Sequence, residues 1–162
     1  MAEENVSATL TIAVSPAAVF AILADPATHS AIDGTGWVRE PVDRSLLTEV
    51  GQLFRMDMHY ARGYRVVNKV HVLEPSRAIG WFTGQEKEDG ELEFGGWTWR
   101  YDLTPLGPSG TEVTLSYDWS VVPQFIRDRG IRFPPFPPDH LVNSLHHLAE
   151  LAEASRLEAK SR

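Results

Sequence analysis

Cysteine is absent from the 162-residue sequence. Its absence excludes a disulfide scaffold, a thiolate nucleophile, an iron–sulfur cluster and any zinc site built on cysteine. No apolar run approaches the ~20 residues that a membrane-spanning helix needs. Residues 1–4 have neither the basic start nor the apolar core of a signal peptide. We therefore predict a cytoplasmic protein without a membrane span.

Positive charge is also scarce. The chain has 15 lysines and arginines against 22 aspartates and glutamates, so its formal net charge is −7 at pH 7. A protein that binds the phosphate backbone of nucleic acids needs an excess of positive charge. We therefore predict no nucleic-acid partner.

Motifs for metal binding and hydrolysis are missing as well. The histidines are His29, His59, His71, His140, His146 and His147, and they form no His-Glu-x-x-His spacing. No serine stands in a Gly-x-Ser-x-Gly elbow, and residues 33–36 (DGTG) lack the third glycine of a nucleotide-binding loop. We interpret the histidines as surface or interfacial residues and predict no catalytic residue, metal ion or cofactor.

Aromatic residues are abundant. The sequence has five tryptophans, four tyrosines and seven phenylalanines, and 43% of its residues are hydrophobic. This composition is typical of a globular protein and supports one well-formed core at this length. Because the chain has neither internal repeats nor a second apolar core, we predict a single domain over residues 1–162.

The first third of the chain predicts a strand followed by two short helices. Residues 6–14 alternate apolar and polar side chains, which is typical of a strand with one buried face. Ser15-Pro16 and Asp25-Pro26 each combine a helix N-cap with the residue best suited to the first helical position. A turn at residues 33–36 ends this region.

The rest of the chain predicts antiparallel strands and a terminal helix. Alternating strands are predicted over residues 52–60, 64–73, 78–83, 97–103 and 113–121. The proline-rich residues 122–138 predict a packed loop with one helical turn near 124–128, and residues 138–157 predict a helix with one broad apolar face. The fold class is therefore α+β, with a curved antiparallel sheet covered by a long C-terminal helix.

One face of the predicted sheet carries an unusual amount of bulk. Its members are Phe54, Met56, Met58, Tyr60, Trp81, Trp97, Trp99, Tyr101, Tyr117 and Trp119. A single helix about 10 Å wide must cover them, and each buried Trp or Tyr needs a polar partner. Either the core is solid and rich in aromatic rings, or a cavity remains between sheet and helix. We favour an apolar ligand pocket, and flexible methionines on this face suit a variable guest.

Two charged features of the sequence are interpreted as parts of the exposed surface. Residues 84–96 hold five acidic residues and one lysine, which predicts a solvated hairpin tip, with a docking surface as the alternative. Arg100 and Asp118 fall on the outer face of the sheet, where we predict an exposed cross-strand ion pair.

The order of elements resembles the helix-grip fold of the START-like, Bet v 1-like (SRPBCC) superfamily, and in particular its polyketide cyclase/dehydrase and lipid transport branch. The matching segments are residues 15–26 (SPAAVFAILADP), 32–36 (IDGTG), 73–77 (LEPSR), 99–103 (WRYDL), 116–120 (SYDWS) and 133–138 (FPPFPP). The resemblance spans nearly the whole chain. Members of this superfamily include ligand carriers, cyclases, hormone receptors and chaperone co-activators, so the fold alone does not decide the function.

The resemblance implies a pocket between the sheet and the C-terminal helix. Its lining would come from the sheet residues named above, faced by Leu141, Leu145 and Leu148, with Phe125, Phe133 and Phe136 at the mouth. Asp33 would lie near the mouth or serve only as a turn residue.

Three functions follow from this interpretation. The first is non-catalytic binding of a small hydrophobic or aromatic molecule, such as a lipid or polyketide. The second is a polyketide cyclase or aromatase, which needs an inward acid or base. Only Tyr60, Tyr101 and Tyr117 are predicted to face inward, with Asp33 and His146 at the margin, so binding is favoured. The third is a protein-interaction module like the chaperone co-activators. The oligomeric state is not predicted.

Overall fold

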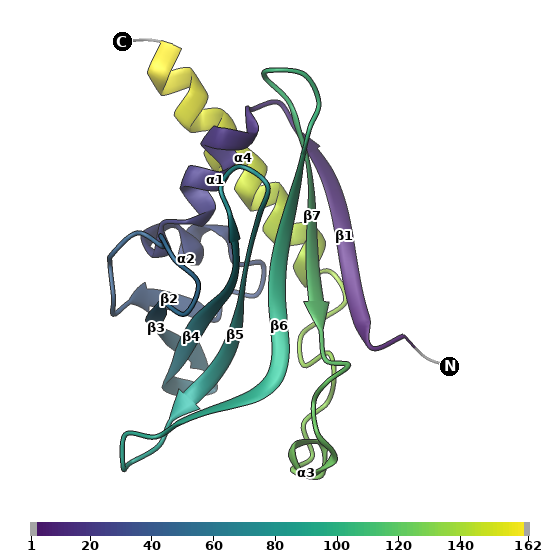
Figure 1. Cartoon of the computed structure of the whole chain (residues 1–162). Helices are drawn as coiled ribbons and strands as arrows, with labels where there is room; N and C mark the ends of the chain where they lie inside the picture. Colours follow the sequence, from purple (N-terminus) through teal and green to yellow (C-terminus); the bar gives the residue numbers. More distant parts are fainter. Residues whose placement is uncertain (1–2, 161–162) are drawn as a thin grey trace.

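A seven-stranded antiparallel sheet curls around one long helix in the computed structural model, which describes residues 3–160 (Figure 1). The strands are β1 (Asn5–Ile12), β2 (Val38–Pro41), β3 (Leu53–Tyr60), β4 (Arg62–Glu74), β5 (Ala78–Glu86), β6 (Leu92–Pro105) and β7 (Thr111–Asp118), in the order β1-β7-β6-β5-β4-β3-β2. The helices are α1 (Pro16–Leu23), the 3₁₀ turn η1 (Pro26–Thr28), α2 (His29–Ile32), α3 (Gln124–Arg127) and α4 (His140–Lys160). The predicted helix-grip architecture is confirmed.

The short helices begin where the capping residues predict. The Ser15 hydroxyl accepts a hydrogen bond from the Ala18 amide at 3.3 Å, and the Asp25 carboxylate accepts one from the Ala27 amide at 3.0 Å. In both cases proline occupies the first helical position, where its missing N–H costs nothing. These caps turn the chain sharply and bring α2 against α4, where Nδ1 of His147 lies 3.2 Å from the Ile32 carbonyl.

Strand register places the aromatic rings of β6 and β7 side by side. Trp99 lies opposite Tyr117, and Tyr101 lies opposite Leu115. The other face of β7 points outward, and its Thr114 hydroxyl bonds to that of Thr9 on β1 at 2.9 Å. Because side chains alternate along a strand, this register gathers the rings on the concave face of the sheet.

The core lies between this concave face and α4. From the helix, Leu141, Leu145, Leu148 and Ala152 are buried. They pack with residues of the sheet and of α1 that include Ile12, Leu23 and Val113. The predicted apolar face of the terminal helix therefore closes one end of the concave sheet. No helix in the described part of the chain is long and apolar enough to cross a membrane.

The predicted ion pair between Arg100 and Asp118 does not form, because the register between β6 and β7 places Arg100 opposite Ser116. Arg100 instead pairs with Asp102 at 3.0 Å on its own strand. The Asp118 carboxylate accepts hydrogen bonds from the amide and the hydroxyl of Ser120. Both acidic residues therefore have local partners.

Candidate functional site

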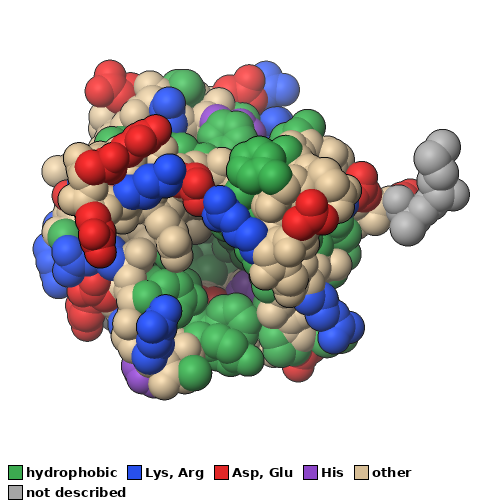
Figure 2. All heavy atoms as spheres, turned by 90° about the horizontal axis from the view of Figure 1, so that it is seen from below, with side chains coloured by type: hydrophobic (Ala, Val, Ile, Leu, Met, Phe, Trp, Pro, Cys, Tyr) green, Lys and Arg blue, Asp and Glu red, His purple; other side chains and the backbone are tan. Residues whose placement is uncertain are grey.

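A cavity of about 410 Å³ lies between the concave face of the sheet, α2, the start of α4 and the segment around α3. Seen from the end of the molecule that carries α3, the surface is hollowed (Figure 2). Hydrophobic side chains gather inside the hollow, and charged side chains surround it (Figure 2). A volume of this size accommodates a small organic molecule.

Eight of the fourteen predicted site residues line this cavity: Met56, Met58, Trp81, Trp97, Trp99, Tyr101, Tyr117 and Phe136. Five others, namely Phe54, Trp119, Leu141, Leu145 and Leu148, are buried in the core and do not line it. Tyr60 does not line it either. It is 61% exposed at the end of β3, and its ring packs on Trp37. The ligand-binding role of these residues stays a prediction.

The aromatic wall is braced by its own ring contacts. The Trp99 ring lies 4.7 Å from that of Tyr117 and 5.3 Å from that of Phe136, and Tyr117 meets Phe136 edge-on at 5.0 Å. Such contacts favour one arrangement of the rings. The wall is therefore formed in advance of any ligand, and part of the aromatic surplus fills the core while the rest faces open space.

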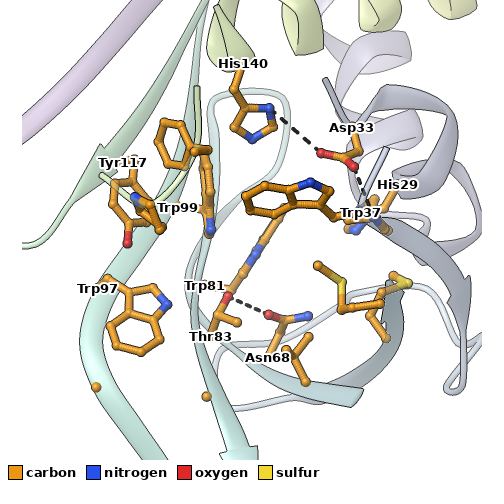
Figure 3. A pocket seen from close by; sticks show the side chains of 18 of the residues that line it. His29, Asp33, Trp37, Asn68, Trp81, Thr83, Trp97, Trp99, Tyr117 and His140 are labelled. Carbon is orange, nitrogen blue, oxygen red and sulfur yellow. Dashed lines mark hydrogen bonds and ion pairs between the residues drawn. The ribbon is translucent and has the colours of Figure 1, made fainter. Parts of the chain in front are cut away.

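Polar hydrogen-bonding groups interrupt this apolar wall. The indole N–H groups of Trp97 and Trp99 have no acceptor among the described residues, and both face the open space (Figure 3). Asn68 is buried, and its side-chain oxygen accepts a hydrogen bond from the Thr83 hydroxyl at 2.7 Å. That bond leaves the amide N–H groups of Asn68 as further donors. Hydrogen-bond donors are thus available along one side of the cavity.

The two inward tyrosines are neutral. Burial raises the pKa of Tyr101 well above its usual range, and the negative charge of Asp33 adds to this shift. Burial alone raises the pKa of Tyr117. Both hydroxyls therefore keep their protons at neutral pH, so they can donate hydrogen bonds but are poor acids.

A buried carboxylate and a buried imidazole meet at the inner end of the cavity. The Asp33 oxygens accept hydrogen bonds from the amide and hydroxyl of Thr35 and from the amide of Val38. Oδ1 of Asp33 lies 3.8 Å from Nδ1 of His140, the first residue of α4 (Figure 3). Burial lowers the pKa of His140, against the opposing effect of the negative charges of Asp33 and Asp139. Asp33 is thus both a turn residue and a cavity residue.

Gly34 makes this contact possible. Its amide donates a hydrogen bond to the buried Ser144 hydroxyl at 2.9 Å, which ties the turn to α4. A Cβ atom at this position would collide with the carbonyl oxygen of His140 and would come within 2.9 Å of the Asn143 Cβ. Glycine therefore permits the close approach that carries Asp33 to His140.

The interpretation of all histidines as surface or interfacial residues is wrong for His29 and His140. His29 stacks on Trp81 with a ring distance of 5.2 Å, and its Nε2 lies 2.9 Å from the carbonyl oxygen of Leu23. Burial lowers its pKa, against the effects of this hydrogen bond and of Asp25. His146, the histidine considered for an inward role, is exposed. The sequence carries a weak signal for His140, which directly follows the prolines and Asp139 that precede α4.

The mouth of the cavity is bridged by an ion pair. Nη1 of Arg129, which follows α3, lies 2.7 Å from Oε1 of Glu93 on β6, and both residues line the cavity. Lys87 approaches the same carboxylate at 3.6 Å. Part of the acidic hairpin is therefore neutralised within the chain. Phe133 lines the cavity, whereas Phe125 is 63% exposed and does not.

No group of three or more metal-ligating side chains lies together within residues 3–157, whose side chains the structure describes. The chemically active groups at the cavity are two imidazoles, two carboxylates, one guanidinium, hydroxyls, indoles and amides. These groups can form hydrogen bonds to a guest and can exchange a proton with it.

Comparison with known proteins points to one family. A family model described as polyketide cyclase / dehydrase and lipid transport matches residues 3–136. The uncharacterised protein Rv0088 of Mycobacterium tuberculosis is 30% identical over 116 residues, which are 71% of this chain and 47% of that protein. The chain spans about half the length of the curated relatives it matches.

Solved structures share the fold at low sequence identity. Protein NE0264 from Nitrosomonas europaea aligns with a TM-score of 0.71 and 15% identity, over 97% of this chain and 99% of that one. The AHSA1 protein SPO3351 from Silicibacter pomeroyi aligns with a TM-score of 0.61 and 20% identity, over 93% and 99%. These likenesses confirm the helix-grip fold.

Proposed function

Because the chain belongs to the polyketide cyclase/dehydrase and lipid transport family, within the SRPBCC superfamily, we propose that it binds a small hydrophobic or aromatic molecule, lipid- or polyketide-like, in the cavity. The observation that carries this proposal is a cavity of about 410 Å³ walled by aromatic rings that brace one another. A preformed wall binds a guest without a large cost in ordering side chains. Apolar burial supplies the affinity, and the polar groups orient the guest.

Binding of the fluorescent probe 1-anilinonaphthalene to the purified protein tests this proposal. Met58 lines the cavity, and its neighbour His59 points out of it, because side chains alternate along β3. We expect Met58→Trp to fill part of the cavity and to weaken probe binding about tenfold, which equals ~1.4 kcal/mol. His59→Trp is the matched control and keeps the parent affinity. Equal affinities in both variants, or no saturable binding by the parent, would contradict the proposal.

Catalysis of polyketide cyclisation is the second candidate, and the pair formed by Asp33 and His140 at the cavity favours it. In such a reaction a base removes a proton from a carbon between two carbonyls. The resulting carbanion attacks a further carbonyl carbon, and the alkoxide formed takes up the proton held by the base. Loss of this hydroxyl together with a second proton from the attacking carbon then releases water and leaves a carbon–carbon double bond. Mass spectrometry of a linear poly-β-ketone incubated with the protein separates the two functions, since a carrier returns the compound unchanged and a cyclase returns a product lighter by water.

A further inference from the structure

His140 presents one ring nitrogen to the cavity. The residue is 6% exposed and extends from the start of α4, with its ring edge-on to Trp99 at 5.4 Å and to Phe136 at 4.8 Å. Nε2, the nitrogen that does not face Asp33, points toward the space between Trp99 and Trp37 (Figure 3). No hydrogen bond connects this Nε2 atom to a described residue, and protein atoms do not seal it off.

The surroundings of the ring assign its proton. Nδ1 faces the Asp33 carboxylate at 3.8 Å and the Ser144 hydroxyl at 3.5 Å. A nitrogen that faces a carboxylate carries the hydrogen, which leaves the other nitrogen of a neutral imidazole as an acceptor. His140 is neutral because its burial disfavours the charged form. Nε2 is therefore an acceptor with no partner among the described residues, at the inner end of an aromatic cavity.

The side-chain oxygens of Asp33 and Asn68 already have donors. Those of Asp33 accept from Thr35 and Val38, and that of Asn68 accepts from Thr83. The indole groups of Trp97 and Trp99 can only donate. A guest that is matched to these groups donates a hydrogen bond at the His140 end and is flat enough to lie along the rings.

We propose that the site formed by His140 and Asp33 recognises a phenol-type hydroxyl on an aromatic ligand, with the hydroxyl donating its hydrogen to Nε2 of His140. The carboxylate of Asp33 holds the imidazole with Nδ1 protonated and makes Nε2 a better acceptor. The aromatic wall takes the ring that bears the hydroxyl. This proposal rests on the proposed binding function and names the class of ligand that the cavity selects.

The proposed hydroxyl site is tested with two naphthalenes, one of which carries a hydroxyl group and the other a methoxy group at the same position. 2-Naphthol donates a hydrogen bond, whereas 2-methoxynaphthalene has the same rings and no donor. Calorimetry gives the ratio of their affinities for the parent protein, for His140→Phe and for His146→Phe. His140→Phe keeps an aromatic ring against Trp99, and the control changes an exposed histidine on the same helix.

We expect the parent and the His146→Phe variant to prefer 2-naphthol by roughly three- to tenfold, the range of one hydrogen bond, and His140→Phe to lose that preference while still binding the ether. An unchanged preference in His140→Phe, or equal affinities in the parent, would overturn the hydroxyl site and leave the binding function standing. If neither naphthalene binds, the binding function fails and the hydroxyl site fails with it.

A nitrogen NMR measurement on the parent protein gives an answer even if His140→Phe does not fold. We expect the Nε2 resonance of His140 to move on addition of 2-naphthol and to stay in place on addition of 2-methoxynaphthalene, because only the phenol donates to this atom. Equal movement with both compounds would overturn the proposal.

Discussion

His29, which is half-buried, and His140, which is buried, show how the cavity depends on single residues held in one ionisation state. His29 lies between Leu23, Phe54 and Trp81, with its ring stacked on the indole and its Nε2 against a backbone carbonyl. His140 lies at the inner end of the cavity. In both, burial favours the neutral imidazole. The two imidazoles therefore add nitrogen atoms to the cavity without adding positive charge.

The stability of the protein is expected to fall in mild acid because of His29. Its pKa is lowered from 6.5 in the folded state, so the unfolded chain takes up a proton that the folded chain resists. The contribution is complete above pH 6.5, the pKa of the unfolded chain, and it is lost as the pH falls through the lower pKa of the folded state. Urea unfolding at about pH 7.5 and about pH 5.5 measures this loss.

His29→Gln removes the titrating group and keeps an N–H donor for the Leu23 carbonyl. We expect the variant to lose less of its free energy of unfolding between the two pH values than the parent does. His146→Gln, at an exposed position, is the control. A loss in His29→Gln equal to that of the parent would show that burial of His29 does not govern the acid sensitivity.

The turn after α2 and the first turns of α4 form a unit at the scale of secondary-structure elements. Gly34 and Ser144 are joined by a hydrogen bond, and the glycine lies directly against the helix backbone. Gly34→Ala is expected to cost about 1–3 kcal/mol of stability, because the methyl group has no room and the backbone must move. Since that movement separates Asp33 from His140, the preference for a phenolic guest should fall as well.

Gly63→Ala is the matched control for this prediction. Gly63 lies on β4 and is exposed, and a Cβ atom added to it would have no neighbouring heavy atom closer than 4.0 Å. We expect the thermal unfolding midpoint of Gly63→Ala to differ from that of the parent by no more than an ordinary surface substitution causes. If the two alanine variants are equally stable in thermal unfolding, then the close approach of the turn to α4 is not a constraint.

The ion pair between β6 and the segment after α3 is expected to slow the release of a guest. Arg129 and Glu93 face each other across the mouth. Because the pair is partly exposed, its effect is small, and Glu93→Gln should raise the dissociation rate of a bound naphthalene probe by about two- to fivefold. Stopped-flow displacement measures this rate. Glu91→Gln, an exposed change in the same hairpin, should leave it unchanged, and equal rates in the two variants would refute a role of the pair in release.

The elements themselves follow from local sequence. Alternation of side chains predicts the strands, Ser15-Pro16 and Asp25-Pro26 predict the short helices, and the apolar stripe predicts α4. The contact between Asp33 and His140 could not be predicted in this way, because it joins distant parts of the chain through the space left by a glycine. The partner of Arg100 also depended on strand register, which the alternating pattern leaves open.

At the scale of the whole molecule, the sheet is larger than one helix can cover. Leu141, Leu145 and Leu148 of α4 pack into the core on the concave face. Phe54 and Trp119 are buried beside the cavity, where their rings contact Trp81 and Phe133. Toward α3 the long helix does not fill the space above the sheet, and Trp81, Trp97 and Trp99 remain only partly buried around the cavity. The division of the aromatic residues between core and cavity follows from the length and place of the helix.

A methionine-methyl NMR titration tests the binding cavity most directly. Met56 and Met58 lie two residues apart on β3, and both line the cavity. With selectively labelled methyl groups, assigned through Met56→Leu and Met58→Leu, addition of 2-naphthol is expected to move both signals along one saturable curve. Signals that stay fixed up to the solubility limit of the naphthol, while the compound binds elsewhere or not at all, would contradict the account.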